Sequence, residues 1–242
     1  YPTFLSPIRI ANDKRIRNLD ITRDCRIVFA NKCWYISIPI ERQVNEKVPD
    51  GTGCALDPGV RKFQTLYSET ETIQFKFKQE RLDKLQKKVS KFQSLRAKKL
   101  ISQSHFTRRL HRLQKKYHAL IDELHFQTIS FITKRYKGIF LPSFESQDMV
   151  EKGFSRSFKR NLLGLKHYKF KQRFIAKCEL ERNVNLKIIT EEYTSQTCVC
   201  GKLTKTSNVE FKCKWCKFTI DRDALGSRNI LLKSRDEMLL KK

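Results

Sequence analysis

The sequence predicts a mixed α/β fold with a small inserted module. Short apolar segments typical of strands alternate along the chain with longer basic segments in which apolar residues recur at helical spacing. Two close pairs of cysteines separate the last predicted strand from the last predicted helix. The 242 residues are enough for one large domain together with small modules.

The beginning of the chain predicts a separate β-rich unit. Residues 1–20 show no clear period, whereas residues 21–29 and 33–41 predict two strands. The polar residues 42–53 form a linker and mark a domain boundary.

The strands of the main sheet are predicted at three places. Residues 54–77 contain a short apolar run that ends in Asp57, then a Pro-Gly turn and two β-rich segments. Residues 138–141 and 184–190 are further apolar strands, and the latter leads directly to Glu191. An Asp-Pro-Gly sequence is usually only a turn, so Asp57 alone is a weak catalytic candidate.

Four segments predict helices. Residues 78–100 and 104–136 form a helical hairpin, residues 158–181 form a third basic helix, and residues 223–240 form the closing helix. The aromatic side chains of the third helix either pack in the core or stack on bases, and packing is the better interpretation. We expect His167, in the same helix, to lie on the surface or to contact phosphate rather than to act as a catalyst.

The charge of the chain predicts a polyanionic partner. Lys and Arg number 51 against 25 Asp and Glu, a formal net charge of +26, and nucleic acid is the commonest polyanion. A membrane fits less well, because the charge is spread along the chain and no apolar run approaches ~20 residues. The basic helix faces are either merely solvated or lie along a phosphate backbone. The residues predicted to bind nucleic acid are Arg108, Arg109, Arg112, Lys115, Lys116, Lys169, Lys171 and Arg173.

The paired cysteines predict a zinc site. Twelve residues separate the pair Cys198 and Cys200 from the pair Cys213 and Cys216, and two such pairs across a hairpin can surround one tetrahedral zinc ion. The first pair is one residue shorter than the usual Cys-x-x-Cys. The alternatives are four reduced cysteines without a metal and, less consistent with the scattered remaining cysteines, disulfide bonds.

Acidic residues flank the cysteine hairpin on both sides. Glu191 and Glu192 precede it, and Asp221 and Asp223 follow it. A hairpin brings its two ends together, so we expect these acids to gather at one place. Carboxylates gathered in a basic protein favour a site for hard cations that act on phosphates.

Several segments of the chain match the motifs of a known family. TSQTC, the cysteine hairpin, DRDALGSRNIL and ALDPGVRKF resemble the nuclease motifs of the transposon-encoded TnpB proteins and of their eukaryotic and viral relatives, the Fanzor proteins. LPSFESQDM and HYKFKQR are similar to the Fanzor branch in particular. The resemblance implies an RNase H-like (RuvC-type) fold with an inserted zinc ribbon. It also implies an RNA-guided DNA endonuclease, with DNA and a guide RNA as partners.

The resemblance implies a division of the chain into four parts. Residues 1–49 would be a β-rich remnant of an N-terminal nucleic-acid-binding lobe, and residues 50–193 the nuclease core with its helical insert. Residues 194–219 would be the zinc ribbon, and residues 220–242 the last nuclease motif and the closing helix. Such a protein would be intracellular, and nuclear in a eukaryote.

The resemblance also implies the chemistry of the site. Asp57, Glu191 and Asp223 would be catalytic and would hold two magnesium ions, one activating a water and the other stabilising the leaving oxygen. The four paired cysteines would hold a structural zinc, because four thiolates leave no open position.

The chain departs from the family in three ways. About fifty residues precede the nuclease motifs where the family has a larger lobe, and the chain begins without Met, so we expect a fragment. Leu225 stands where the family usually has Asn, and the first cysteine pair is shortened. These departures leave open a second function, a catalytically impaired zinc-containing protein that only binds DNA or RNA. A DDE-type transposase fits less well, because the zinc ribbon separates the last two acids.

The middle carboxylate of the nuclease site has three candidates. Bacterial relatives usually place a Glu directly after the strand matched by residues 138–141, but that position is Pro142 here. Glu145 lies beyond a Pro-Ser-Phe turn, whereas Glu191 directly follows an apolar strand, and a strand end fixes a carboxylate better than a loop. We therefore predict Glu191, with Glu192 next, since adjacent strand residues point to opposite faces.

Overall fold

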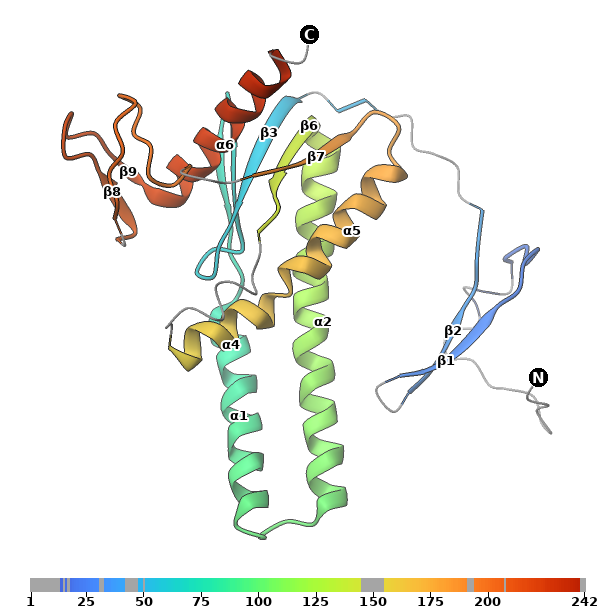
Figure 1. The fold of residues 1–242 in the computed structure, drawn as a ribbon. Helices are drawn as coiled ribbons and strands as arrows, with labels where there is room; N and C mark the ends of the chain where they lie inside the picture. Colours follow the sequence, from blue (N-terminus) through green and yellow to red (C-terminus); the bar gives the residue numbers. More distant parts are fainter. Residues whose placement is uncertain are drawn as a thin grey trace. The chain divides into compact units, whose positions relative to one another are not determined.

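The fold is that of a computed structural model, drawn in Figure 1. The chain divides into two compact units, Tyr1–Gln43 and Val44–Lys242. The residues that the structure describes are 14, 16, 18–30, 33–41, 48–49, 51–144, 155–190, 194–206 and 208–239.

The first unit contains a β-hairpin. Strands β1 (Arg26–Ala30) and β2 (Cys33–Ser37) pair antiparallel, which confirms the two predicted strands, although both are shorter than their predicted ranges. Phe29 lies opposite Trp34 in the register, and their ring centroids are 4.8 Å apart. Such cross-strand aromatic pairs stabilise a hairpin.

The second unit is built on a five-stranded mixed sheet, so the predicted α/β class is confirmed. Its strands are β3 (Gly51–Pro58), β4 (Gln64–Ser68), β5 (Thr72–Phe75), β6 (Tyr136–Pro142) and β7 (Asn185–Ile189). Their order is β5-β4-β3-β6-β7. The contiguous strands β3, β4 and β5 pair antiparallel, whereas β3, β6 and β7 run parallel, so the carboxyl ends of these three strands lie at one edge.

Alternation along β3 assigns its side chains to two faces. Cys54 and Leu56 belong to the core that includes helix residues such as Ile129, whereas Ala55 belongs to a separate core with Ile230. Because successive strand residues point to opposite faces, Asp57 shares the face of Ala55.

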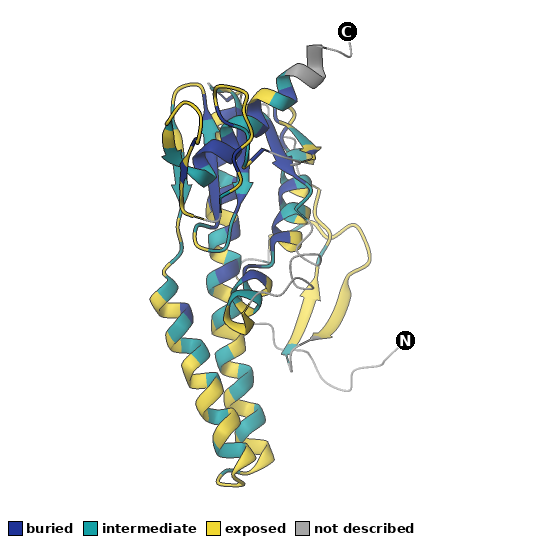
Figure 2. Cartoon of the chain, turned by 60° about the vertical axis from the view of Figure 1, so that its left-hand side comes forward, coloured by how far each residue is buried: buried dark blue, intermediate teal, exposed yellow. Residues whose placement is uncertain are grey.

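Five helices are described in this unit. They are α1 (Gln79–Ala97), α2 (Gln103–Arg135), α4 (Arg156–Leu165), α5 (His167–Glu179) and α6 (Arg222–Leu239). Helices α1 and α2 form the predicted hairpin, and Figure 2 shows burial concentrated in the sheet and in the adjoining end of α2. In the described part of the chain, no helix combines the length and apolarity needed to cross a bilayer.

The prediction of one helix over residues 158–181 is wrong, because the segment forms α4 and α5 with a break between them. Lys166 at the break has a left-handed backbone, with φ of 52°. The break lets both helices bury apolar side chains, Leu162 and Leu165 from α4 and Phe170 from α5. The carbonyl of Leu165, which ends α4, accepts a hydrogen bond from Nε2 of His125 at 2.9 Å.

The prediction that His167 lies on the surface is also wrong. His167 is the first residue of α5 and is buried, as is His125 of α2. Both imidazoles stack on the ring of Phe63, directly before β4, with centroids 5.3 and 5.1 Å from it. The charge of an imidazolium would be strongly disfavoured at such a site.

The buried histidines predict a pH dependence of stability. Burial lowers the pKa of His125 to about 4 and that of His167 to about 3, whereas unfolded histidine titrates near 6.5. As the pH falls below about 6.5, the unfolded chain takes up protons that the folded chain does not, so the free energy of unfolding falls. Between about pH 7.5 and about pH 5.5 each buried histidine should account for about 1.4 kcal/mol of that fall.

Chemical denaturation of the His125→Phe variant at the two pH values checks this. The pH-dependent loss of stability should be smaller by about 1.4 kcal/mol than in the original chain. His105→Phe, at an exposed position of α2, should leave the loss unchanged. An unchanged loss in His125→Phe would contradict a neutral buried imidazole.

Candidate active site and cysteine cluster

A cavity of about 680 Å³ opens at the carboxyl end of β3. Asp57 and Asp223, which are far apart in the sequence, both line it. The other residues around the cavity are Pro58, Gly59, Val60, Arg61, Lys62, Phe144, Ser155, Phe158, Thr206, Val209 and Arg222. Two carboxylates and three cationic side chains therefore line the same cavity.

Asp57 reaches the cavity from β3 and lies against the start of α6. It is the last residue but one of the strand and is half-buried. A Cβ added to Gly226 would lie 2.8 Å from Oδ2 of Asp57, so the carboxylate packs directly on the backbone of the helix. Gly226 and Asp223 are three residues apart and share a face of α6, which brings the two acids to the same side.

Asp221 has a role that the sequence alone did not assign to it. It ends β9 (Thr219–Asp221), and its Oδ1 accepts hydrogen bonds from the backbone N–H groups of Asp223 at 3.1 Å and Ala224 at 3.2 Å. This is the geometry of a helix N-cap. The signal that could have revealed it is an Asp close to the start of a predicted helix, although α6 begins one residue earlier than predicted, at Arg222.

Lys62 joins the two aspartates at the start of α6. Its Nζ lies 2.5 Å from Oδ2 of Asp221 and 3.2 Å from Oδ2 of Asp223, and its side chain is 13% exposed. Burial opposes the charge of Lys62, but the hydrogen bond to Asp221 and the charge of Asp223 outweigh it and raise the lysine pKa. Burial likewise opposes the charge of Asp221, yet Lys62 and the N–H of Ala224 lower the pKa of its carboxyl.

Lys62 carries no sequence signal beyond its place in ALDPGVRKF. Its partner Asp221 is 159 residues away, so the ion pair depends on the packing of α6 against the sheet. The structure thus adds Lys62 to the predicted site, as the partner of Asp221 and Asp223, two of the acids expected to gather there.

The three candidates for the middle carboxylate lie outside the described residues. These are Glu145, Glu191 and Glu192. Strand β7, which precedes two of them, ends at Ile189, whose carbonyl accepts a hydrogen bond from the N–H of Ser143 at 2.9 Å. Glu191 therefore stays a prediction.

The residues predicted to bind nucleic acid fall into two groups. Those on α2, between Arg108 and Lys116, are exposed. On α5, by contrast, Arg173 pairs with Asp122 at 2.8 Å and Lys169 pairs with the same carboxylate at 3.7 Å. The assignment of both groups stays a prediction.

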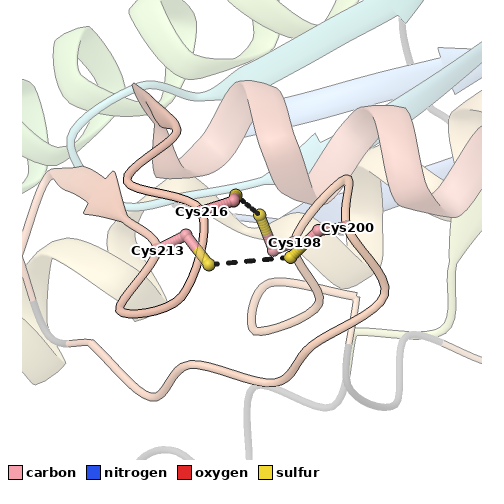
Figure 3. Close-up of side chains that lie close together, drawn as sticks. All are labelled: Cys198, Cys200, Cys213 and Cys216. Atoms are coloured by element: carbon pink, nitrogen blue, oxygen red, sulfur yellow. Dashed lines mark hydrogen bonds between the residues drawn. The ribbon is translucent and has the colours of Figure 1, made fainter.

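The four cysteines of the predicted zinc site form a compact cluster (Figure 3). All four sulfur atoms lie within 4.8 Å of one another, with Cys198 3.5 Å from Cys216 and Cys200 3.8 Å from Cys213. A tetrahedral zinc ion with bonds of about 2.3 Å would hold its sulfur ligands about 3.8 Å apart. The cluster could therefore hold zinc with little movement.

The shortened first pair reaches the cluster through a tight turn. Gly201, directly after Cys200, has a left-handed backbone with φ of 80°, and its N–H donates to the carbonyl of Cys198 at 3.0 Å. On the other side of the cluster, the backbone N–H groups of Cys216 and Trp215 point at the sulfur of Cys213 and lower its pKa to about 6. The turn brings the first pair to the cluster, and the N–H groups favour the thiolate of Cys213, whereas burial raises the pKa of Cys198 to about 12.

The cysteine cluster is packed directly on α6. Cys198 and Cys213 share a buried core with Phe211 of β8 (Glu210–Lys212) and with Leu225 of α6. Nδ2 of Asn229 on the same helix donates to the carbonyls of Thr194 at 2.8 Å and Thr197 at 2.7 Å. The segment that carries the cysteines is thus held to the helix that carries Asp223.

The chain is similar to several known proteins. Residues 167–230 match the family described as "Cas12f1-like, TNB domain". The chain is 35% identical to "Putative transposase A625R" of Paramecium bursaria Chlorella virus 1 over 63% of this chain and 34% of that protein. It is 24% identical to "TnpB-like protein L79" of Acanthamoeba polyphaga mimivirus over 74% of this chain and 36% of that protein.

Two further similarities extend over most of the chain. "Putative RNA-guided DNA endonuclease InsQ" of Escherichia coli (strain K12) is 25% identical over 89% of this chain and 56% of that protein. The structure of a Cas12f1-sgRNA-target DNA complex aligns with a TM-score of 0.56 at 17% identity over 81% of this chain and 42% of the solved chain. The latter shows a shared fold.

The mixed sheet and the helices around it give this chain a mixed α/β fold that it shares with the solved Cas12f1 protein. In sequence the chain is similar to the TnpB-like proteins. It spans between about a third and just over half of the length of the relatives named above.

The cysteine cluster predicts about one zinc ion per chain. Metal analysis of protein purified without chelator checks the content. Cys216→Ser and Cys200→Ser should each lose most of the zinc, since both sulfurs stand within the cluster. Cys25→Ser, an exposed cysteine of the first unit, should keep it. Full zinc content in Cys200→Ser would show that the shortened pair supplies one ligand fewer.

Proposed function

We propose that this chain is the nuclease part of a transposon-associated, RNA-guided DNA endonuclease with an RNase H-like (RuvC-type) core. The observation that carries the proposal is the cavity of about 680 Å³ in which Asp57 and Asp223 stand beside Arg61, Lys62 and Arg222. Cleavage of a phosphodiester needs both kinds of side chain, cations for the phosphate and hard oxygen ligands for a metal ion. The mixed sheet with α6 on one face supports the RNase H-like core.

Asp57, Asp223 and Glu191 would hold divalent metal ions, with magnesium the best match to carboxylate oxygens. Bound there, the ions would supply an activated water and stabilise the leaving oxygen of the phosphodiester. The chain itself orients the ligands. Asp57 is fixed by the end of β3 and the backbone of α6, and Asp223 by the ion pair with Lys62.

Glu191 remains our choice for the middle carboxylate, although it lies outside the described residues. Ile189 of β7 packs in the core on the α6 face of the sheet. Glu191 is two residues further on, so a chain that stayed extended would bring its side chain to that same face, where Asp57 points. Glu192 would then point to the opposite face.

The cysteine cluster would hold zinc in a structural role. Four thiolates complete a tetrahedral site and leave no position for a substrate. Since Leu225 and the cysteines share one core, the zinc would fix the start of α6 and with it Asp223. The cluster would thus be the zinc ribbon that the family carries between its last two acids.

DNA and a guide RNA are the proposed partners. The net charge of +26 and the exposed basic face of α2 suit a nucleic-acid duplex. InsQ is described as RNA-guided, and the solved Cas12f1 complex contains a single guide RNA and target DNA. The viral relatives, together with LPSFESQDM and HYKFKQR, support the Fanzor branch of the family.

The acids of the cavity predict a loss of cleavage without a loss of binding. Asp57→Asn, Asp223→Asn and Glu191→Gln should each lower Mg²⁺-dependent cleavage of single-stranded DNA by about a hundredfold or more. Affinity for the DNA should change little and should not fall, because each variant removes a negative charge and leaves every cationic side chain in place. Cleavage and electrophoretic binding assays on the same preparations measure both.

Glu145→Gln is the matched control for Glu191→Gln, and it should cleave normally. If Glu145→Gln is inactive while Glu191→Gln is active, the middle acid lies after β6. A chain that binds DNA but never cleaves it with Mg²⁺ would support the impaired, binding-only alternative instead.

The exposed face of α2 predicts steeply salt-dependent binding. Replacing Arg108, Arg109 and Arg112 with Gln should weaken DNA binding and flatten the plot of log affinity against log salt by about 0.9 for each phosphate that is no longer neutralised. Arg135→Gln is the control on the same helix, since Arg135 already pairs with Glu71 at 2.8 Å. An equal slope in all variants would show that the α2 face is merely solvated.

A further inference from the structure

The loop between β3 and β4 forms part of the active-site wall. Residues 59–62 all line the cavity, with Asp57 two residues before the loop and Lys62 at its end. The loop is closed by a hydrogen bond from the N–H of Gly59 to the carbonyl of Phe63 at 3.3 Å. A Cβ at Gly59 would lie 2.7 Å from the carbonyl oxygen of Lys62, so the turn is tight. The contacts that fix this loop therefore also fix the positions of Asp57 and Lys62.

His167 contacts the start of the loop. Its Nε2 lies 3.2 Å from the carbonyl oxygen of Gly59. A carbonyl can only accept, so Nε2 carries the hydrogen and donates it. The side chain is buried, and Nδ1 has no hydrogen-bond partner among the residues that the structure describes. The bond to Gly59 is therefore the one polar contact by which the described part of the chain orients this ring.

The other end of the loop is held by stacked rings. Phe63 is completely buried and stacks with the imidazoles of His167 and His125 at interplanar angles of 18° and 13°. His125 is itself fixed, because its Nδ1 accepts from Arg173 at 3.1 Å and Arg173 pairs with Asp122. Helices α2 and α5 thus present a rigid base to the loop.

We infer that His167 is a positioning residue of the active site, which holds the 59–62 loop through Gly59 and thereby places Asp57 and Lys62. The inference rests on the proposed function, because it assigns a purpose to the loop's position. It also explains the break between α4 and α5. The left-handed Lys166 starts a new helix at His167 and delivers the ring to Gly59.

Three substitutions of His167 test its hydrogen bond to Gly59 separately from the packing of its ring. The amide nitrogen of Gln reaches about as far from Cα as Nε2, whereas that of Asn reaches about as far as Nδ1. His167→Gln should therefore keep the bond to Gly59, and His167→Asn should lose it. His167→Phe keeps a ring to stack on Phe63 but has no donor. His105→Asn, at an exposed position, controls for loss of a histidine.

Two measurements on the zinc-loaded chain test the inference. Hydrogen exchange of the backbone amides of residues 59–63 reports the loop, and Mn²⁺ titration by calorimetry reports the metal site. In His167→Asn and His167→Phe the loop amides should exchange about tenfold faster, and Mn²⁺ affinity should fall about tenfold, as for other residues that orient metal ligands. His167→Gln and His105→Asn should resemble the original chain in both.

Equal exchange of residues 59–63 in all variants would overturn the inference, and so would a loosened loop with unchanged Mn²⁺ affinity. The Asp57→Asn variant distinguishes a failure of this inference from a failure of the proposed function. If Mn²⁺ binding to the original chain does not depend on Asp57, the proposed metal site is wrong. The exchange data then decide by themselves whether His167 holds the loop.

Discussion

Helix α6 approaches the end of β3 so closely that residue 226 has no room for a side chain. A Cβ there would come within 2.8 Å of the Asp57 carboxylate, so glycine is required at that position. The same approach buries Ile230 against Ala55 and brings Lys62 to the two aspartates at the start of the helix. These contacts fix the positions of β3 and α6, two of the elements that line the cavity.

The cysteine hairpin determines where that helix begins. It ends in Asp221, which caps α6, and its sulfur cluster rests on Leu225 two residues after Asp223. Leu225 therefore fills an apolar core beside the cluster and does not line the cavity. A metal ion that ordered the cysteine hairpin would therefore also fix the position of Asp223.

Much of the fold could be predicted because its helices and strands are strongly periodic, and Asp57 and Asp223 were predicted from their motifs. The break at Lys166 was missed because no Gly or Pro occupies it, and a left-handed lysine has no local signal. Long-range packing likewise decided the burial of His167 and the ion pairs of Lys62. Neither the burial of His167 nor the ion pairs of Lys62 can be predicted from the residues next to them in the sequence.

The most direct measurement is a crystal structure of the zinc-loaded chain grown with Mn²⁺, with anomalous scattering recorded at the manganese edge. A manganese peak is expected in the cavity, about 2 Å from carboxylate oxygens of both Asp57 and Asp223, as for a hard cation on carboxylates. Lys62 should remain beside Asp221 at the start of α6. A manganese peak elsewhere, with neither Asp57 nor Asp223 in contact with the ion, would contradict the proposed metal site.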